Sequence, residues 1–156
     1  MTFRVSPLDS QAFEHLYGRT DEELLSLGAR RMVATVKPGF PCRLTLADAE
    51  VGESVLLVHF EHQPGNSPYR ASHAVFVREH ATSVAPFDGA LPDAIALRLL
   101  SVRAFDAADM MIDADVVKGS KAEPVISRML DNTEVAYLHL HNAKPGCFAA
   151  RVDRLA

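Results

Sequence analysis

The C-terminal stretch, residues 134–154, constrains the fold most, because its residues alternate with a period of two until a turn signal interrupts them. On a β-strand, residues two apart share one face of the sheet and the residues between them share the other. Three side chains that can hydrogen-bond have this spacing, namely Tyr137, His139 and His141. Lys144-Pro145-Gly146 then predicts a turn, since proline removes a ladder donor and glycine permits a positive φ. A second strand from Cys147 to Asp153 completes the predicted hairpin.

Two registers of this hairpin are open. Pairing of Ala143 with Cys147 puts Arg151 opposite His139, whereas a slip of one residue puts Arg151 among the leucines. Burying an unpaired charge costs on the order of several kcal/mol, so we expect the first register. Its polar face carries Tyr137, His139, His141, Arg151 and Asp153. Its apolar face carries Leu138, Leu140, Phe148, Ala150 and Val152.

The whole chain predicts an α+β fold, as a single domain over residues 1–156 with a mostly antiparallel sheet built from hairpins and about four short helices. Capping residues before apolar stripes predict helices over residues 6–18, 20–28, 91–97 and 120–131. Alternating apolar residues predict strands over residues 31–37, 54–62, 73–78, 99–106 and 110–118. Residues 54–62 begin apolar on both faces, which is typical of a central strand.

Charge and composition argue against several classes of function. A net charge of −4 provides no positive field for nucleic acid or for an anionic membrane surface, so neither partner is expected. The sequence shows neither a signal peptide nor an apolar run long enough for a transmembrane helix, and we therefore expect a cytoplasmic protein. In that compartment Cys42 and Cys147 are expected to be reduced thiols.

Several motifs spread over most of the chain resemble a known family. They are Gly39-Phe40-Pro41-Cys42-Arg43, the Asp48–Glu53 turn followed by Leu56-Leu57, Pro68–Ser72 leading into Val75–Arg78, Ser101–Asp106, and His139–Ala143 with Pro145-Gly146-Cys147. Together they resemble the domain-of-unknown-function family 1203 of small bacterial proteins. The resemblance implies no activity, because that family is functionally uncharacterised. One departure is His73, where a small residue such as glycine is expected.

The histidines and cysteines could in principle form a metal site or a catalytic cysteine site, but the sequence favours neither. Imidazoles two apart, as in His139 and His141, can share an ion, and Cys147 or Cys42 could complete a tetrahedral set. No glutamate follows at a suitable spacing and no C-x-x-C or H-E-x-x-H is present, so we expect neither a metal nor another cofactor. Cys42 beside Arg43 could be an activated thiolate served by His139 or His141, but a buried structural cysteine is the commoner case.

The remaining hypothesis combines the polar face with the loop from Gln63 to Ser72. If that loop covers the face, side chains from several elements could hold a small anionic metabolite, with arginines binding its carboxylate or phosphate. The ligand-binding residues assigned to this pocket are Arg43, Tyr69, Arg70, Arg103 and Arg151. Two alternatives stay open: an enzyme in which His139 or His141 acts as general base, and a homodimeric interaction protein without a ligand.

Overall fold

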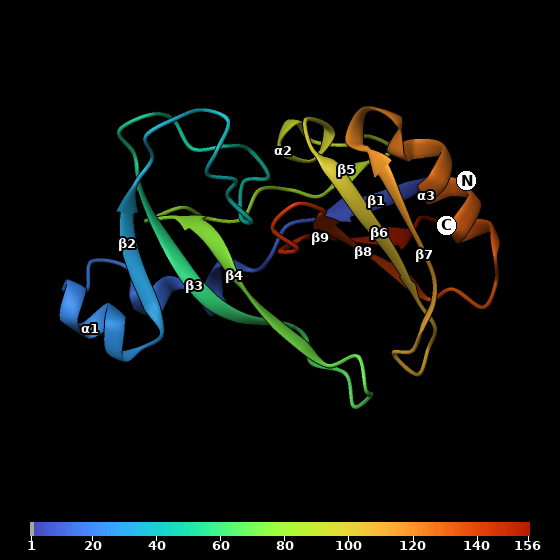
Figure 1. The fold of residues 1–156 in the computed structure, drawn as a ribbon, viewed down its shortest axis with the longest axis horizontal. Helices are drawn as coiled ribbons and strands as arrows, with labels where there is room; N and C mark the ends of the chain where they lie inside the picture. The colour runs from blue at the N-terminus through green and yellow to red at the C-terminus, as the bar shows by residue number, and fades with distance from the viewer. Residues whose placement is uncertain (1) are drawn as a thin grey trace.

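The computed structural model describes residues 2–156. Its regular elements are two antiparallel β-sheets and three short α-helices, joined by loops and 3-10 turns (Figure 1). The larger sheet has six strands in the order β5-β1-β9-β8-β6-β7, and the smaller has three in the order β2-β3-β4. The larger contains β1 (Phe3–Ser6), β5 (Phe87–Asp88), β6 (Leu99–Phe105), β7 (Met111–Lys118), β8 (Tyr137–Asn142) and β9 (Phe148–Arg154). The smaller contains β2 (Ala29–Val33), β3 (Ser54–Gln63) and β4 (Ala71–Arg78). An α+β fold with mostly antiparallel pairing is thereby confirmed.

The α-helices are α1 (Asp21–Ser26), α2 (Asp93–Ala96) and α3 (Ala122–Asp131), and the 3-10 turns are η1 (Ser10–Ala12), η2 (Glu14–Leu16) and η3 (Gly119–Lys121). The expected helix over residues 6–18 is wrong. Ser6 belongs to β1, where it pairs with Arg151, and Asp9 caps only the 3-10 turn η1. Burial of Phe3 and Val5 against the six-stranded sheet outweighs the local helix-start signal, so the chain leaves the strand too late to form a full helix.

Separate apolar clusters stabilise the two sheets. Helix α3 covers one face of the six-stranded sheet with Ile126, Met129 and Leu130, as its apolar stripe predicts. The three-stranded sheet packs instead against the N-terminal 3-10 turns through Phe13 and Leu16. β3 is central, as predicted, and its first residues are buried on both faces.

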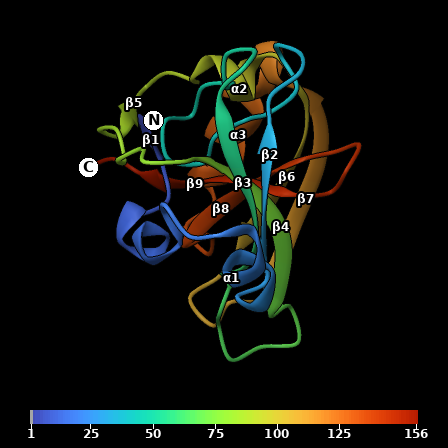
Figure 2. The same ribbon diagram turned by 90° about the vertical axis from the view of Figure 1, so that its left-hand side faces the viewer.

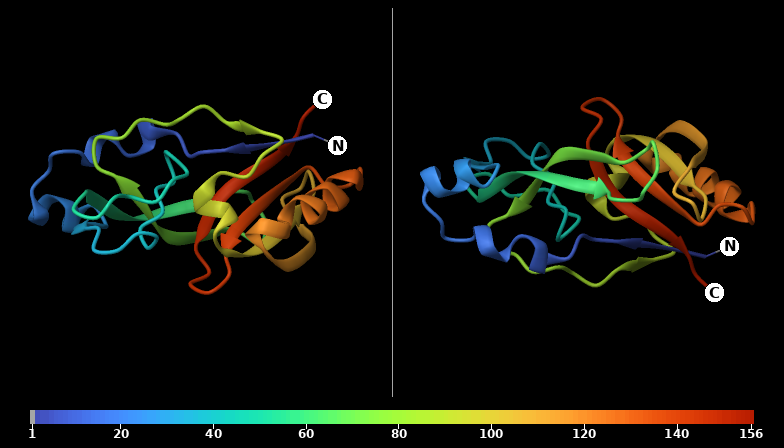
Figure 3. Two further views of the ribbon diagram at one scale, coloured as in Figure 1. Left: turned by 90° about the horizontal axis from the view of Figure 1, so that it is seen from above. Right: turned by 90° about the horizontal axis from the view of Figure 1, so that it is seen from below.

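The two sheets meet along the β3-β4 hairpin. Figure 2 shows the three-stranded sheet in front of the six-stranded one, and Figure 3 shows the two chain ends side by side. Segments near Cys42 connect the sheets, since Cys42 bridges to Phe76 of β4 and the Arg43 side chain reaches β9. The far end of β3 therefore comes to lie over β8 and β9, on the face that α3 does not cover.

A buried carboxylate, Glu79, ties the N-terminal segment to the smaller sheet. It accepts hydrogen bonds from Arg31, from the Ser54 hydroxyl and from the Gly18 amide. The Arg31 guanidinium is the main cause that lowers the pKa of Glu79 to about 2. Asp21 binds the same guanidinium, but its side chain is 85% exposed, against 6% for Glu79.

This difference predicts unequal effects on stability. Glu79→Gln is expected to lower the free energy of unfolding by about 1–2 kcal/mol, because the amide keeps one acceptor oxygen but removes the negative charge that pairs with the part-buried Arg31 guanidinium. Asp21→Asn, the matched control, is expected to cost less than about 1 kcal/mol. Urea unfolding at pH 7 measures both, and equal losses would contradict the buried network.

Candidate functional site

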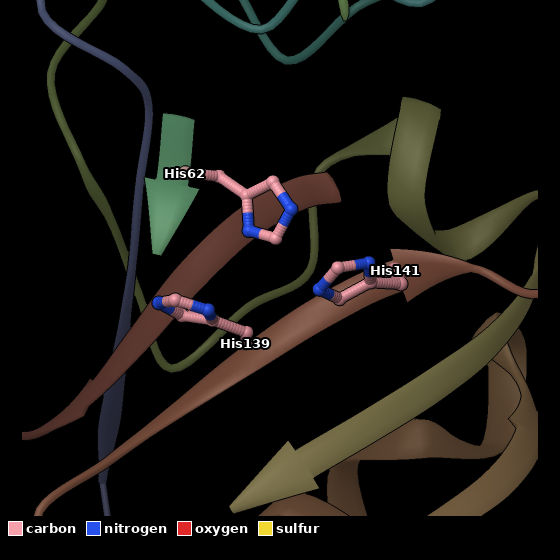
Figure 4. Close-up of side chains that lie close together, drawn as sticks. All are labelled: His62, His139 and His141. Atoms are coloured by element: carbon pink, nitrogen blue, oxygen red, sulfur yellow. The ribbon is translucent and has the colours of Figure 1, made fainter. Parts of the chain in front are cut away.

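Three histidines converge where the end of β3 crosses β8. His139 and His141 come from β8 and His62 comes from β3, and one potential ligand nitrogen of each lies within 4.8 Å of the other two. Figure 4 shows the three imidazoles turned toward one another. The distance between ring centroids is 5.0 Å for His62 and His141 and 6.1 Å for His62 and His139.

Two β-bulges shape this cluster. The pairing of β3 with β4 shifts between Phe60 and Gln63, next to His62. The pairing of β8 with β9 shifts between Leu140 and His141, so that His141 lies opposite Phe148. A bulge re-aims the side chains beside it and is common next to functional sites.

The second bulge overturns one predicted position. Strict alternation puts Phe148 on the apolar face, but the extra residue, Ala149, moves it to the histidine face. There its ring stacks on His62 with a centroid distance of 5.2 Å and an angle of 9° between the ring planes. The predicted pairing of His139 with Arg151 is confirmed, because it precedes the bulge.

Burial keeps the three histidines neutral. His139 and His141 are 4% and 2% exposed. Desolvation is the largest cause that lowers the pKa of each to about 3 and that of His62 to about 4, and nearby cationic and imidazole groups add to it. At neutral pH all three rings therefore have a lone pair available, whereas a pKa near 3 makes them weak general bases.

Hydrogen bonding within the described chain leaves two buried ring nitrogens of this cluster without a partner. The Nδ1 of His141 lies 2.9 Å from the Gly146 carbonyl. A carbonyl only accepts, so Nδ1 donates its hydrogen and Nε2 carries the lone pair. The Nδ1 atoms of His62 and His139 are buried and have no partner anywhere in residues 2–156. An unsatisfied buried polar atom costs about 1–3 kcal/mol, a cost that a bound ligand would remove.

The cluster has the composition of an open metal centre. Zn–N bonds of about 2.0–2.1 Å place tetrahedral ligand nitrogens about 3.3 Å apart. The three nitrogens here lie within 4.8 Å of one another, which is wider than this spacing. Small side-chain rotations would bring them onto one ion. Three protein ligands leave a fourth coordination position for water or for another small ligand.

A pocket of about 440 Å³ adjoins the histidines and is lined by His62 and His139 together with Tyr137, Asp109 and Arg151. The Tyr137 hydroxyl donates to Asp109 at 2.5 Å and accepts from the Gln63 amide at 2.8 Å. Burial and the Asp109 carboxylate raise the pKa of Tyr137 to about 12, so its hydroxyl stays protonated. The wall of the pocket thus offers an aromatic surface, the carboxylates of Asp9, Glu61 and Asp109, and one guanidinium.

The two arginines expected beside the histidines differ in what they can bind. Arg151 lies over the Tyr137 ring, 4.2 Å from its centroid, and its guanidinium donates to Asp153. Arg103 pairs with His139 across the β6-β8 ladder. It makes no ion pair within residues 2–156, and it does not line the pocket. Its charge helps to hold the histidine pKa values low.

The loop expected to cover the polar face does reach the six-stranded sheet. Its Ser67 hydroxyl donates to the Asp109 carbonyl, and a Cβ at Gly65 would meet the Asp109 side chain at 2.4 Å. Tyr69, however, is 39% exposed and packs its edge on Phe105. Arg70 binds Glu61 at the surface. Neither Tyr69 nor Arg70 lines the pocket.

Arg43 lies away from the histidine pocket. Its guanidinium is buried and donates to the carbonyls of Pro41 and Phe148 and to the sulfur of Cys147. The neighbouring Cys42 instead accepts the backbone N–H of Arg78. The sequence pairing of Cys42 with Arg43 as a reactive unit therefore does not match the contacts, because the arginine reaches the other cysteine.

His62 is the functional candidate that sequence reasoning missed. It ends the strand with the strongest apolar pattern, and the sequence alone does not say which segment that end approaches. One feature of the sequence could have pointed to it: His62 lies at the end of a predicted strand, directly before the loop that was expected to cover the polar face. The bulge that aims His62 toward β8 has no marker such as glycine in Glu61-His62.

Comparison with known proteins shows the family. The family model described as "Protein of unknown function (DUF1203)" matches residues 39–154, and the chain belongs to this family. The match includes all three histidines. No curated protein and no solved structure matches the chain significantly. Within residues 2–156 no helix has the length and apolar character needed to cross a membrane.

The lowered histidine pKa values predict how stability depends on pH. An unfolded histidine titrates near 6.5, so the unfolded chain binds more protons below that pH and the stability contributed by neutral, buried rings is lost between about pH 6.5 and 3. Without added metal, the free energy of unfolding is expected to fall by up to about 1.4 kcal/mol per pH unit for each fully buried ring.

His139→Gln removes one such ring, so its stability is expected to decline less steeply from pH 6.5 to 4.5 than that of the wild type. His59→Gln, at an exposed position on β3, controls for the general effect of losing a histidine. Urea unfolding in chelator across this range measures the slopes, and identical slopes for His139→Gln and the wild type would refute the neutral buried state.

Proposed function

We propose that this protein binds one divalent transition-metal ion through His62, His139 and His141, and that the ion holds a small anionic ligand in the adjoining pocket. The observation that carries this proposal is the convergence of three neutral imidazoles from two sheets, with two buried ring nitrogens that have no partner in residues 2–156. A metal ion would accept one lone pair from each imidazole and bind the two sheets together.

The donor set selects the kind of ion. Neutral imidazole nitrogens suit Zn²⁺, Co²⁺, Ni²⁺ or Cu²⁺, whereas Mg²⁺ and Ca²⁺ require oxygen ligands. Burial strengthens the site, because ligands that stay neutral at pH 7 need not lose a proton before binding. The hydrogen bond from His141 to Gly146 fixes one ring in the tautomer that presents Nε2, as an outer-shell carbonyl does in many metal sites.

Charge in the pocket makes anion binding depend on the metal. Of the expected arginines, Arg151 is the one that lines the pocket, and it is already bound to Asp153, while Asp109 adds a carboxylate to the wall. Without an ion, this wall is a poor anion site. Three neutral ligands leave the full charge of a divalent ion uncompensated, so a carboxylate or phosphate group can occupy the fourth position. Arg103, beside His139 and free of carboxylates within residues 2–156, adds to the positive field.

An enzyme built on this site would use a metal-bound water. A divalent ion with three imidazole ligands can lower the pKa of bound water to about 7, which gives a hydroxide nucleophile at neutral pH. The histidines would then be ligands instead of general bases, in keeping with their pKa values near 3. Homodimerisation stays a separate prediction, and the exposed Ile112 and Val116 on edge strand β7 are where we would look for the interface.

Metal content tests the proposal directly. Protein freed of metal is expected to take up about one equivalent of Zn²⁺ per chain, and to melt at a higher temperature at saturation because only the folded state holds the complete site. His62→Ala and His139→Ala are each expected to abolish stoichiometric binding. His59→Ala, on the same strand as His62, is the matched control and is expected to bind as the wild type does. Zn²⁺ uptake that survives loss of His139 would exclude this site.

The dependence of anion binding on the metal is tested with the Co²⁺ form. Azide or phosphate is expected to change its visible spectrum and to raise its melting temperature further, since the anion takes the open position. The same anions are expected to leave the metal-free protein unchanged. Arg103→Ala is expected to weaken anion binding without removing the metal. Equal stabilisation of both forms by phosphate would show that the arginines, and not the metal, hold the anion.

A further inference from the structure

A second cavity, of about 830 Å³, shares no lining residue with the histidine pocket. The smaller sheet contributes Leu57 of β3 and Phe76 of β4 to its wall. Leu97 and Leu99, which follow helix α2, contribute from the larger sheet's side of the chain, and the turn from β8 to β9 adds Pro145. A cavity of this size with a mainly apolar wall is typical of a site for a small organic molecule.

Two leucines of this wall remain open to solvent. Leu97 is 65% exposed and Leu99 is 40% exposed. Arg98, which lies between them, is held instead by the Asp48 carboxylate and the Ala94 carbonyl. Large apolar side chains that are exposed close together in a hollow mark a place where apolar groups bind. The hydrocarbon part of a ligand would cover this surface.

Among the described residues, the wall contains basic side chains but no carboxylate. The basic residues that line it are Arg43, His73, Arg98, Lys118 and Lys144. The whole chain, by contrast, has 20 acidic and 16 basic residues and a net charge of −4. A hollow lined by one sign of charge focuses the field and raises the local concentration of ions of the opposite sign. The cavity is thus suited to an anion, although the protein as a whole is not.

Two lysines of the wall are available to bind an anionic group directly. Lys118 and Lys144 are exposed and make no ion pair within residues 2–156. Arg98 is not available in this way, because its guanidinium is paired with Asp48, whose side chain is 2% exposed. Lysine carries three donors on a flexible stem, so a pair of lysines can close on a carboxylate that enters between them.

A further positive charge in the wall is buried, and it favours an anion independently of the lysines. Arg43 is 2% exposed, donates to two backbone carbonyls and to the Cys147 sulfur, and makes no ion pair with a carboxylate in the described chain. Burial lowers the pKa of Arg43, and the charge of Arg98 acts in the same direction. A buried cation without a counter-charge is costly, so an anion in the cavity would stabilise Arg43 across the poorly polarisable interior.

We propose that this cavity binds a small organic monocarboxylate with an apolar body, such as a medium-chain fatty acid. Lys118 and Lys144 bind the carboxylate, and the hydrocarbon chain covers Leu97 and Leu99. The charge of Arg43 attracts the carboxylate without touching it. The site is separate from the histidine cluster and does not depend on a metal ion. Because both sheets contribute to the wall, the bound acid also stabilises the junction between them.

Titration calorimetry with straight-chain acids tests the proposal in the whole protein, treated with chelator so that no carboxylate binds a metal at the histidines. Octanoate is expected to bind with one equivalent per chain. Each methylene added from butanoate to octanoate is expected to tighten binding by about two- to fourfold, because it buries more apolar surface. Acetate and inorganic phosphate, which are anions without an apolar body, are expected to show no binding.

Uncharged 1-octanol separates the charge from the chain. It is expected to bind at least about tenfold more weakly than octanoate, because it lacks the charge that the lysines attract. A merely apolar hollow would have the opposite preference, since burying an alcohol costs less than burying a carboxylate. Octanol that binds as tightly as octanoate would therefore overturn the anion site.

Exposed positions provide the variants, so folding is preserved. Lys118→Gln combined with Lys144→Gln is expected to weaken octanoate at least about fivefold and to leave 1-octanol unchanged. Lys121→Gln, an exposed lysine outside the cavity, is the matched control. Leu97→Gln is expected to weaken both ligands, whereas Leu25→Gln is expected to weaken neither, because Leu25 has the same 65% exposure but lies outside the cavity.

Three results would overturn the proposal. Octanoate that does not bind, or that binds equally well without the two lysines, would exclude a carboxylate site here. An affinity that does not change with chain length would exclude the apolar contact. Light scattering that reports a dimer for the wild type and a monomer for Leu97→Gln would assign this surface to a second copy of the chain.

Discussion

The burial of three uncharged imidazoles between two sheets is the constraint on which the rest of this structure depends. Neutral rings in an apolar setting still need partners for their nitrogens, and the Phe148 ring that stacks on His62 cannot provide them. A metal ion, as we propose, would satisfy these nitrogens while also joining β3 to β8. The stability of the junction and the chemistry of the site would then have one origin. The loop after β3 is held to Asp109 by the Ser67 hydroxyl.

Polar groups gather where the two sheets meet. In the histidine cluster, the imidazoles carry no charge at neutral pH and would gain a cation from solution. Arg43, by contrast, brings its own charge into the interior and donates a hydrogen bond to Cys147. The β8-β9 hairpin contributes to both arrangements, because His139 and His141 lie on β8 and Cys147 precedes β9.

Local periodicity predicted much of this fold and little of the site. Alternation along β8 and β9 correctly placed Arg151 opposite His139, because an arginine among leucines is too costly to bury. It failed at Phe148, where a bulge inserts one residue, and at residues 6–18, where pairing of β1 outweighs a helix start. His62 and the contact of Arg43 with Cys147 both depend on segments far apart in sequence, for which a single chain gives no pairing rule. The expectation that no metal binds was based on the two histidines of β8 alone, with no following glutamate and no C-x-x-C or H-E-x-x-H.

X-ray absorption at the metal edge of the Zn²⁺- or Co²⁺-loaded protein tests the central claim most directly, since it counts the nitrogen ligands and measures their distances. The account predicts three imidazole nitrogens at about 2.0–2.1 Å with a lighter oxygen donor in the fourth position, and the loss of one imidazole in His62→Ala. A spectrum dominated by sulfur, or one with two or fewer imidazoles in the wild-type protein, would contradict it.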